Sequence, residues 1–151
     1  RRHRVVTGHM TDSSVIVAKC YCGDVEYTVS RNVTPFKSVY CHCDSCRRAH
    51  AAPMYQVIYI PSGDFTIIAG HELVQSFRKE GSSVTRAFCR NCGSRLYNLL
   101  QHRPDWLGVF PSLFDDETQR NIPHSICPTY HYHSEEAVLD LSKIHDGISR
   151  T

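Results

Sequence analysis

The sequence has no long run of apolar residues, no large excess of charge of either sign, and no repeated or low-complexity segment. Its 151 residues include 17 Lys and Arg against 15 Asp and Glu, so the formal net charge is only +2. A nearly neutral chain shows no electrostatic footprint for nucleic acid. A membrane-spanning helix would need about 20 consecutive apolar residues. We therefore expect neither nucleic acid nor a membrane as a partner, and the oligomeric state stays open.

The first residues differ in character from the rest of the chain. Arg1-Arg2-His3-Arg4 is basic, and Thr7-Gly8-His9-Met10 resembles the remnant of a cleaved tag before a native Met10. A processed or disordered native N-terminus is the alternative. We expect residues 1–9 to be such a remnant or leader and residues 10–151 to form a single domain, which suits their number. No signal peptide is visible, so the cysteines are expected in a reducing compartment, the cytoplasm or alternatively the nucleus.

Short apolar and β-branched segments, separated by Gly, Pro or Asp, run through most of the chain and indicate a mainly β fold of short antiparallel strands. A helical turn is expected over residues 43–50, capped by Asp44 or Ser45 and stopped by Pro53. A short helix is expected over residues 134–144. The expected strands cover residues 15–18, 25–29, 38–40, 55–60, 65–68, 73–78, 84–88, 95–99, 106–110 and 130–133.

Seven of the eight cysteines fall into closely spaced groups, and such spacings favour metal chelation over a disulfide framework. Cys20-Tyr21-Cys22 lies at the tip of an expected hairpin, and Cys89-Arg90-Asn91-Cys92-Gly93 has the form of a zinc knuckle. Together these pairs supply four thiolates for a structural zinc, whose binding would stabilise the fold. The eighth cysteine, Cys127, is expected to be a buried, inert thiol.

The segment Cys41-His42-Cys43-Asp44-Ser45-Cys46 supplies three more thiols within six residues. Three protein ligands leave one corner of a tetrahedral zinc open, which distinguishes a working site from a structural one. A soft thiolate site favours the thiol of a small molecule over water oxygen as its fourth partner. The alternatives are a closed site completed by His50, His42 or Cys127, and thiols that are empty or oxidised and serve a redox role.

Other charged and imidazole side chains are candidates for contact with a substrate. Arg47 and Arg48 follow the last of these cysteines, where they can offset the negative charge of the thiolates or hold a substrate carboxylate; a solvated surface is the alternative. His50 is the candidate acid for protonating an alkoxide, although no feature singles it out. His131 and His133 share one face of an expected strand and are expected on the surface.

These cysteine segments resemble the glutathione-dependent formaldehyde-activating enzyme family, which also includes the domain of centromere protein V. The order and spacing of three segments match: Lys19-Cys20-Tyr21-Cys22-Gly23, Cys41-His42-Cys43-Asp44-Ser45-Cys46-Arg47-Arg48 and Phe88-Cys89-Arg90-Asn91-Cys92-Gly93-Ser94. Leu113-Phe114-Asp115-Asp116 and Pro128-Thr129-Tyr130-His131 resemble weaker motifs, so the resemblance covers roughly Val15 to His133. The chain departs from the family in having Ala51 where many relatives have glycine, and in lacking a tryptophan near Ala137.

The resemblance implies a mainly β fold similar to that of the B-type methionine sulfoxide reductases, with two zinc ions per chain. It also implies a carbon–sulfur lyase type of reaction that joins glutathione and formaldehyde into S-hydroxymethylglutathione, and the reverse reaction. The implied zinc ligands are Cys20, Cys22, Cys89 and Cys92 for the structural ion, and Cys41, Cys43 and Cys46 for the second ion.

The sequence thus supports two functions of different classes. In the first, the chain is an enzyme whose open zinc site binds a small thiol such as glutathione, which then adds to an aldehyde; Arg47 and Arg48 would position the carboxylates of that thiol. In the second, the chain is a zinc-stabilised interaction module without turnover, of the centromere protein V type. A long basic tail would favour the second function, and only the leader is basic, so we favour the enzyme.

Overall fold

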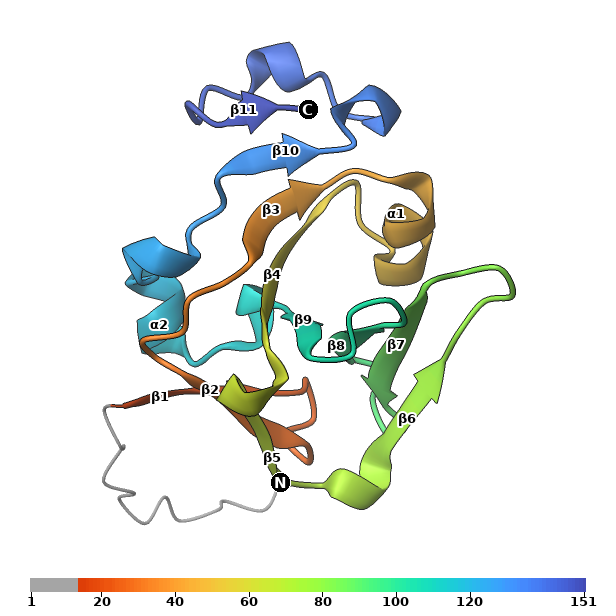
Figure 1. Cartoon of the computed structure of the whole chain (residues 1–151), viewed down its shortest axis with the longest axis vertical. Helices are drawn as coiled ribbons and strands as arrows, with labels where there is room; N and C mark the ends of the chain where they lie inside the picture. The colour runs from red at the N-terminus through yellow and green to blue at the C-terminus, as the bar shows by residue number, and fades with distance from the viewer. Residues whose placement is uncertain (1–13) are drawn as a thin grey trace.

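A computed structural model describes residues 14–151, so the hypothesis of a tag remnant or leader over residues 1–9 lies outside the described part. This part is mainly β, as predicted, and its strands form a three-stranded sheet in the order β1-β2-β5 and an eight-stranded sheet in the order β11-β10-β3-β4-β9-β8-β7-β6 (Figure 1). The strands are β1 (Val15–Lys19), β2 (Glu26–Ser30), β3 (Lys37–Cys41), β4 (Tyr55–Pro61), β5 (Phe65–Ala69), β6 (Val74–Phe77), β7 (Val84–Cys89), β8 (Arg95–Leu100), β9 (Trp106–Val109), β10 (Tyr130–Tyr132) and β11 (Ser149–Arg150). The α-helices are α1 (Asp44–His50) and α2 (Asp116–Arg120), and the 3-10 turns are η1 (Ser62–Asp64), η2 (His71–Leu73), η3 (Pro111–Leu113), η4 (His124–Ile126), η5 (Ser134–Glu136) and η6 (Leu141–Lys143).

The three-stranded sheet begins with the hairpin that the sequence predicts. Strands β1 and β2 pair antiparallel, and each buries every second side chain, as a strand with one face on the core does. Ile16 and Ala18 are buried on β1, and Tyr27 and Val29 are buried on β2. The Tyr27 hydroxyl donates a hydrogen bond to the carbonyl of Leu96 at 3.2 Å, which ties this sheet to β8 of the larger one.

The core lies between the two sheets. Its largest cluster combines the inward side chains of β1 and β2 with those of β4 and β9, and Ile126 from the turn η4 adds to it. Each such side chain contributes roughly 1.5–3 kcal/mol when it is fully buried. The buried members of the cluster are Ile16, Ala18, Tyr27, Val29, Val33, Ile58, Ile60, Leu107, Val109, Phe114 and Ile126.

The eight-stranded sheet is antiparallel from β3 to β6 through β4, β9, β8 and β7. At its other edge, β10 runs parallel to β3, and the short β11 runs parallel to β10, at the top of Figure 1. This pairing sets Tyr132 beside Cys41 and His131 beside Tyr40. The C-terminal segment therefore lies against the strand that leads into the C-x-C-x-x-C segment.

Helix α1 follows β3 directly and occupies the predicted turn over residues 43–50. Its N-cap is Cys43, whose sulfur accepts a hydrogen bond from the backbone N–H of Cys46 at 3.4 Å. The expectation of Asp44 or Ser45 as the cap was wrong. The sulfur takes the position that a hydroxyl or carboxylate oxygen usually holds at a helix start.

The end of α1 is set by a left-handed residue ahead of the predicted stop at Pro53. Ala51 has φ 49° and donates its backbone N–H to the carbonyl of Arg47. Glycine takes this conformation without penalty, whereas a residue with a Cβ pays roughly 1 kcal/mol. Ala51 therefore occupies a position whose backbone conformation favours glycine.

The helix expected over residues 134–144 is not formed, and that prediction was wrong. Two separate turns, η5 and η6, take its place. The carboxylate of Asp140 accepts hydrogen bonds from both the backbone N–H and the hydroxyl of Ser142, and so starts a new turn at Leu141. Such local side-chain bonds compete with a continuous helix.

Within residues 14–151, no helix is both long and apolar enough to cross a membrane. This agrees with the lack of a long apolar run in the sequence.

Candidate metal centres

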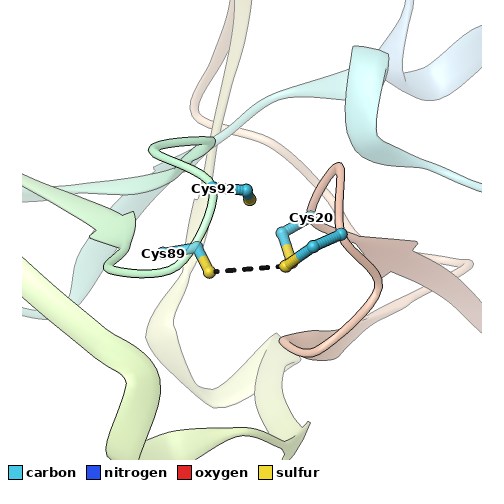
Figure 2. Close-up of side chains that lie close together, drawn as sticks. Cys20, Cys89 and Cys92 are labelled. Carbon is cyan, nitrogen blue, oxygen red and sulfur yellow. Dashed lines mark hydrogen bonds between the residues drawn. The ribbon is translucent and has the colours of Figure 1, made fainter.

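The first candidate centre brings together four cysteines from two turns that lie far apart in the sequence. Cys20 and Cys22 come from the turn between β1 and β2, and Cys89 and Cys92 from the turn between β7 and β8 (Figure 2 labels three of them). The four sulfur atoms all lie within 4.8 Å of one another. Four thiolates at such separations form a complete tetrahedral set for zinc, so the residues fit the metal that the spacing predicts.

Hydrogen bonds outside the four sulfur atoms hold these two turns together. The backbone N–H of Tyr21 donates to the Ser94 hydroxyl at 2.9 Å, and the Asn91 amide donates to the Asp24 carboxylate at 3.0 Å. Gly93 has φ 75° and donates its backbone N–H to the Cys89 carbonyl, which closes the knuckle. The first turn therefore docks on the second through its side chains and backbone as well as through its thiols.

The second candidate centre comes from one short segment. Cys41 ends β3, Cys43 caps α1, and Cys46 lies in the first turn of that helix. Their three sulfur atoms lie within 4.8 Å of one another, and the group contains no fourth His, Cys, Asp or Glu ligand among the described residues. The set fits a thiolate-rich metal such as zinc and leaves one tetrahedral position to another partner.

The electrostatics of this segment favour one ionised thiol. Hydrogen bonds from the Cys41 and Cys43 thiols hold the pKa of Cys46 well below its usual range, while burial acts in the opposite direction. The Tyr55 hydroxyl, 3.4 Å from the Cys46 sulfur, and the Arg86 guanidinium, 3.8 Å from it, act in the same direction as the two thiols. A thiolate is the form in which cysteine binds metals.

The three-cysteine centre opens onto a cavity of about 510 Å³, a size that suits a small-molecule ligand. Its wall combines apolar surface with polar groups: besides the three cysteines it carries hydroxyl, cationic and anionic groups from α1, β4, β7, β10 and the loop between β6 and β7. The polar residues that line it are Ser45, Tyr59, Lys79, Glu80, Ser82, Ser83, Arg86, Tyr132 and His133.

Neither arginine that follows the cysteine segment is among the described residues that line this cavity. Arg47 donates from Nε to the carbonyl of His42 at 2.9 Å and pairs with Asp44 at 3.5 Å. Arg48 pairs with the same carboxylate at 2.9 Å and is largely exposed. The structure thus places both side chains back on their own helix, and the expected contact with a substrate carboxylate has no geometric support.

His50 also lies outside the cavity and outside the group of three sulfur atoms. Its ring stacks on Tyr55 with the centroids 4.0 Å apart and meets the edge of Phe110. Burial lowers the pKa of His50 to about 4, so the ring is neutral at pH 7 and is poorly suited to protonate an alkoxide. Cys127 is outside the group as well; it is only partly buried, and its thiol donates to the carbonyl of Pro123 at 3.7 Å.

The expectation that His131 lies on the surface was wrong. Its side chain is completely buried on β10, and Nδ1 lies 2.8 Å from Nε2 of His42, which is also completely buried. The Nε2 of His131 lies 2.8 Å from the Asp146 carboxylate. With neutral rings, His131 donates to Asp146 and His42 donates to His131. Asp146 in the C-terminal segment is therefore connected to the residue between two of the cysteines. His133 is partly exposed and lines the cavity.

Arg86 is the cavity residue that the sequence analysis missed. It lies on β7, 40 positions from Cys46, and is only 5% exposed. Its Nη2 donates to the Ser45 hydroxyl at 3.3 Å and approaches the Cys46 sulfur at 3.8 Å. The one available signal was a charged residue inside a strand whose neighbours are mostly apolar.

Comparison with known proteins agrees with this arrangement. The family model described as "Glutathione-dependent formaldehyde-activating enzyme" matches residues 15–135, which include both cysteine groups. A crystal structure of a Rhodobacter sphaeroides protein, solved in a structural genomics programme, is similar with a TM-score of 0.57 and 21% sequence identity, over 72% of this chain and 95% of that one. At that identity it supports the fold alone. The chain belongs to the glutathione-dependent formaldehyde-activating enzyme family.

Proposed function

We propose that the protein catalyses the reversible addition of the glutathione thiol to formaldehyde, a carbon–sulfur lyase type of reaction that gives S-hydroxymethylglutathione. The observation that carries this proposal is the three-cysteine centre, whose sulfur atoms converge at a polar cavity of about 510 Å³. The family of the chain supports the choice of glutathione and formaldehyde. Zinc held by Cys41, Cys43 and Cys46 would supply a Lewis acid that keeps a bound thiol in its thiolate form.

The chemical step needs a thiolate beside an aldehyde carbon. The glutathione sulfur attacks the carbon of formaldehyde, the carbon–sulfur bond forms, and the electron pair of the carbonyl bond moves to oxygen, which then takes a proton. In the reverse direction the hydroxyl loses its proton and the carbon–sulfur bond breaks. The cavity would hold both reactants with their reacting atoms in contact, which removes most of the entropic cost of bringing them together.

The cavity wall offers charges of both signs at its outer part. Lys79 and Glu80 are exposed residues of the loop between β6 and β7, and His133, which directly follows β10, lines the same cavity. Glutathione carries two carboxylates and one ammonium group, so Lys79 and His133 can bind its carboxylates and Glu80 its ammonium. These residues replace Arg47 and Arg48 as the groups proposed to position the substrate.

Cobalt substitution tests this function at the metal. We expect glutathione to intensify the thiolate-to-cobalt charge-transfer bands of the cobalt-loaded protein, and S-methylglutathione, which lacks a free thiol, to leave them unchanged. Cys43→Ser should abolish the response. Formaldehyde should change the spectrum only after glutathione has been added. Turnover itself is measured by exchange NMR with ¹³C-formaldehyde, after subtraction of the spontaneous rate.

A spectrum indifferent to glutathione, together with exchange no faster than the spontaneous rate, would contradict the enzyme. The zinc-stabilised interaction module would then be the better description.

A further inference from the structure

Arg86 is a buried cation without a carboxylate partner among the described residues. It is only 5% exposed, and it forms no ion pair with any residue in the described range 14–151. Its Nε is buried without a hydrogen-bond acceptor, and its hydrogen bonds with described residues come from Nη2 alone. Burying a guanidinium without a matching negative charge is costly. The Cys46 sulfur is the anionic neighbour of Arg86, and the unpaired Nε leaves a donor for an anionic group of a substrate.

The position of Arg86 in the cavity indicates which anion this is. Arg86 is buried, its Nη2 is 3.8 Å from the Cys46 sulfur, and the partly buried Tyr59 lines the same cavity. Lys79 is an exposed residue of the same cavity and lies at its rim. The two cations thus differ in their surroundings: Arg86 is buried beside the Cys46 sulfur, and Lys79 is exposed to solvent.

We propose that Arg86 is a catalytic residue that stabilises the negative charge developing on the formaldehyde oxygen. This inference rests on the proposed function and adds an oxyanion-stabilising group, a role that the sequence assigned to no residue. As the glutathione sulfur bonds to carbon, the carbonyl electron pair moves to oxygen, and the guanidinium N–H groups of Arg86 donate to it until a proton from water completes the hydroxyl. In reverse, Arg86 stabilises the same alkoxide before the carbon–sulfur bond breaks.

Covalent geometry favours this oxygen over the carboxylates of glutathione. The oxygen of S-hydroxymethylglutathione is two bonds from the sulfur, whereas the carbon of each carboxylate is separated from that sulfur by at least six bonds. A guanidinium beside the cluster sulfur therefore reaches the reacting oxygen, while the carboxylates extend toward Lys79 at the rim. Fixed donors aimed at developing charge in a site shielded from water contribute strongly to catalysis.

The kinetic test compares the two cations. Arg86→Gln should lower kcat for exchange about 100-fold, the effect expected from losing an oxyanion donor, while KM for glutathione changes little. Lys79→Gln, the matched control, should raise KM and leave kcat near the wild-type value. Both variants are compared at wild-type zinc content, because Arg86 also contacts Cys46. A wild-type kcat in metal-loaded Arg86→Gln, or a loss confined to KM, would overturn the assignment.

A binding test reports on the same residue without turnover. Glutathione sulfonate carries negative oxygens beside the sulfur, whereas S-methylglutathione has the same peptide without them. By calorimetry, the zinc-loaded wild type should bind the sulfonate about tenfold or more tightly than the methyl analogue. This ratio of affinities corresponds to the free energy of one charge-assisted hydrogen bond. Arg86→Gln should lose this preference and Lys79→Gln should keep it. An equal preference in both variants would contradict the proposal.

Two further results separate this inference from the function it rests on. If the wild type shows neither exchange above the spontaneous rate nor a cobalt response to glutathione, the proposed function fails, and the oxyanion role fails with it. If the wild type is active and Arg86→Gln does not retain zinc, the decision rests on Arg86→Lys. Its shorter side chain and compact ammonium cannot serve both the Cys46 sulfur and the substrate oxygen, so an unchanged kcat in that variant would overturn the assignment.

Discussion

The two cysteine groups of this protein have similar ligands but different relations to the chain. In the four-cysteine centre, Cys22 and Cys89 approach within 3.8 Å although 67 positions separate them. In the three-cysteine centre, all ligands come from the six residues between Cys41 and Cys46. The first centre connects the two sheets. The second centre lies within a single strand-to-helix turn.

This difference suggests that one centre stabilises the fold and that the other takes part in the reaction. A cross-link that closes a long loop removes more conformational freedom from the unfolded chain than one that closes a short loop. The four-cysteine centre also provides a complete ligand set, so metal there has no position left for a substrate. The three-cysteine centre closes almost no loop, provides three ligands and faces the cavity. Folding should therefore depend on the first centre and activity on the second.

The largest expected effect tests this division directly. Cys89→Ser should unfold the protein or make it insoluble, because a structural zinc contributes on the order of 10 kcal/mol, as much as the whole stability of a typical domain. Circular dichroism and thermal melts of the purified variant measure this loss.

The matched control is Cys43→Ser in the other centre. It should remain folded, with one zinc per chain by elemental analysis, and should melt close to the wild type. The reverse ranking of the two variants would show that the roles of the centres are exchanged.

A second expectation concerns how readily the two metals leave. A mild chelator should remove zinc from the three-cysteine centre first, because its exchangeable position and the adjoining cavity let the chelator enter the coordination sphere. Zinc release followed with a chromogenic chelator should show two phases of equal amplitude, and the fast phase should be absent in Cys43→Ser. Release of both ions in one phase would argue against the comparison.

The sequence was sufficient for those features that depend on local spacing. The hairpin that carries Cys20 and Cys22, the helical turn after Cys41, and the mainly β fold all follow from residue patterns within about ten positions. The convergence of the two distant cysteine pairs was also predictable, because pairs of cysteines at these short spacings are typical of metal sites, and one structural zinc needs the ligands of two such pairs. The more specific likeness to B-type methionine sulfoxide reductases stays a prediction, as does the division into a leader and one domain.

Features that depend on sheet pairing could not be predicted from local patterns. Arg86 reaches the Cys46 sulfur only because the folded chain brings β7 close to α1, and neither residue signals the other in sequence. His131 is buried because β10 joins the edge of β3 in parallel and is itself covered by β11. A Tyr-His-Tyr-His alternation gives no information about which face will be covered.

The C-terminal segment, which covers the edge of β3, forms a chain of hydrogen bonds that leads to the three-cysteine centre. His42, between two of the cysteines, is connected through His131 to Asp146, and Arg150 of β11 also contacts that carboxylate at 3.3 Å. The backbone of Thr151 bonds to His131 as well. The two turns that carry the four-cysteine centre, between β1 and β2 and between β7 and β8, lie in the lower half of Figure 1, away from β10 and β11 at the top. A substitution of Asp146 should therefore affect the three-cysteine centre and leave the four-cysteine centre unchanged.

The smallest expected effect is the pH dependence of this support. The hydrogen bond from His131, with a further one from the backbone of Ile148, lowers the pKa of Asp146 from 3.8 to about 2. A carboxyl whose pKa is lower in the folded state adds stability that is complete above its unfolded pKa and is lost as the pH falls through its folded pKa. The free energy of unfolding of the wild type should thus exceed that of Asp146→Asn by a constant amount above pH 5, and the difference should shrink from pH 4 toward pH 2. Urea unfolding followed by Trp106 fluorescence at each pH measures it, and the matched pair cancels the loss of zinc in acid, which both proteins share. A difference that stays constant down to pH 2.5 would mean that Asp146 supports His131 by its shape and not by its charge.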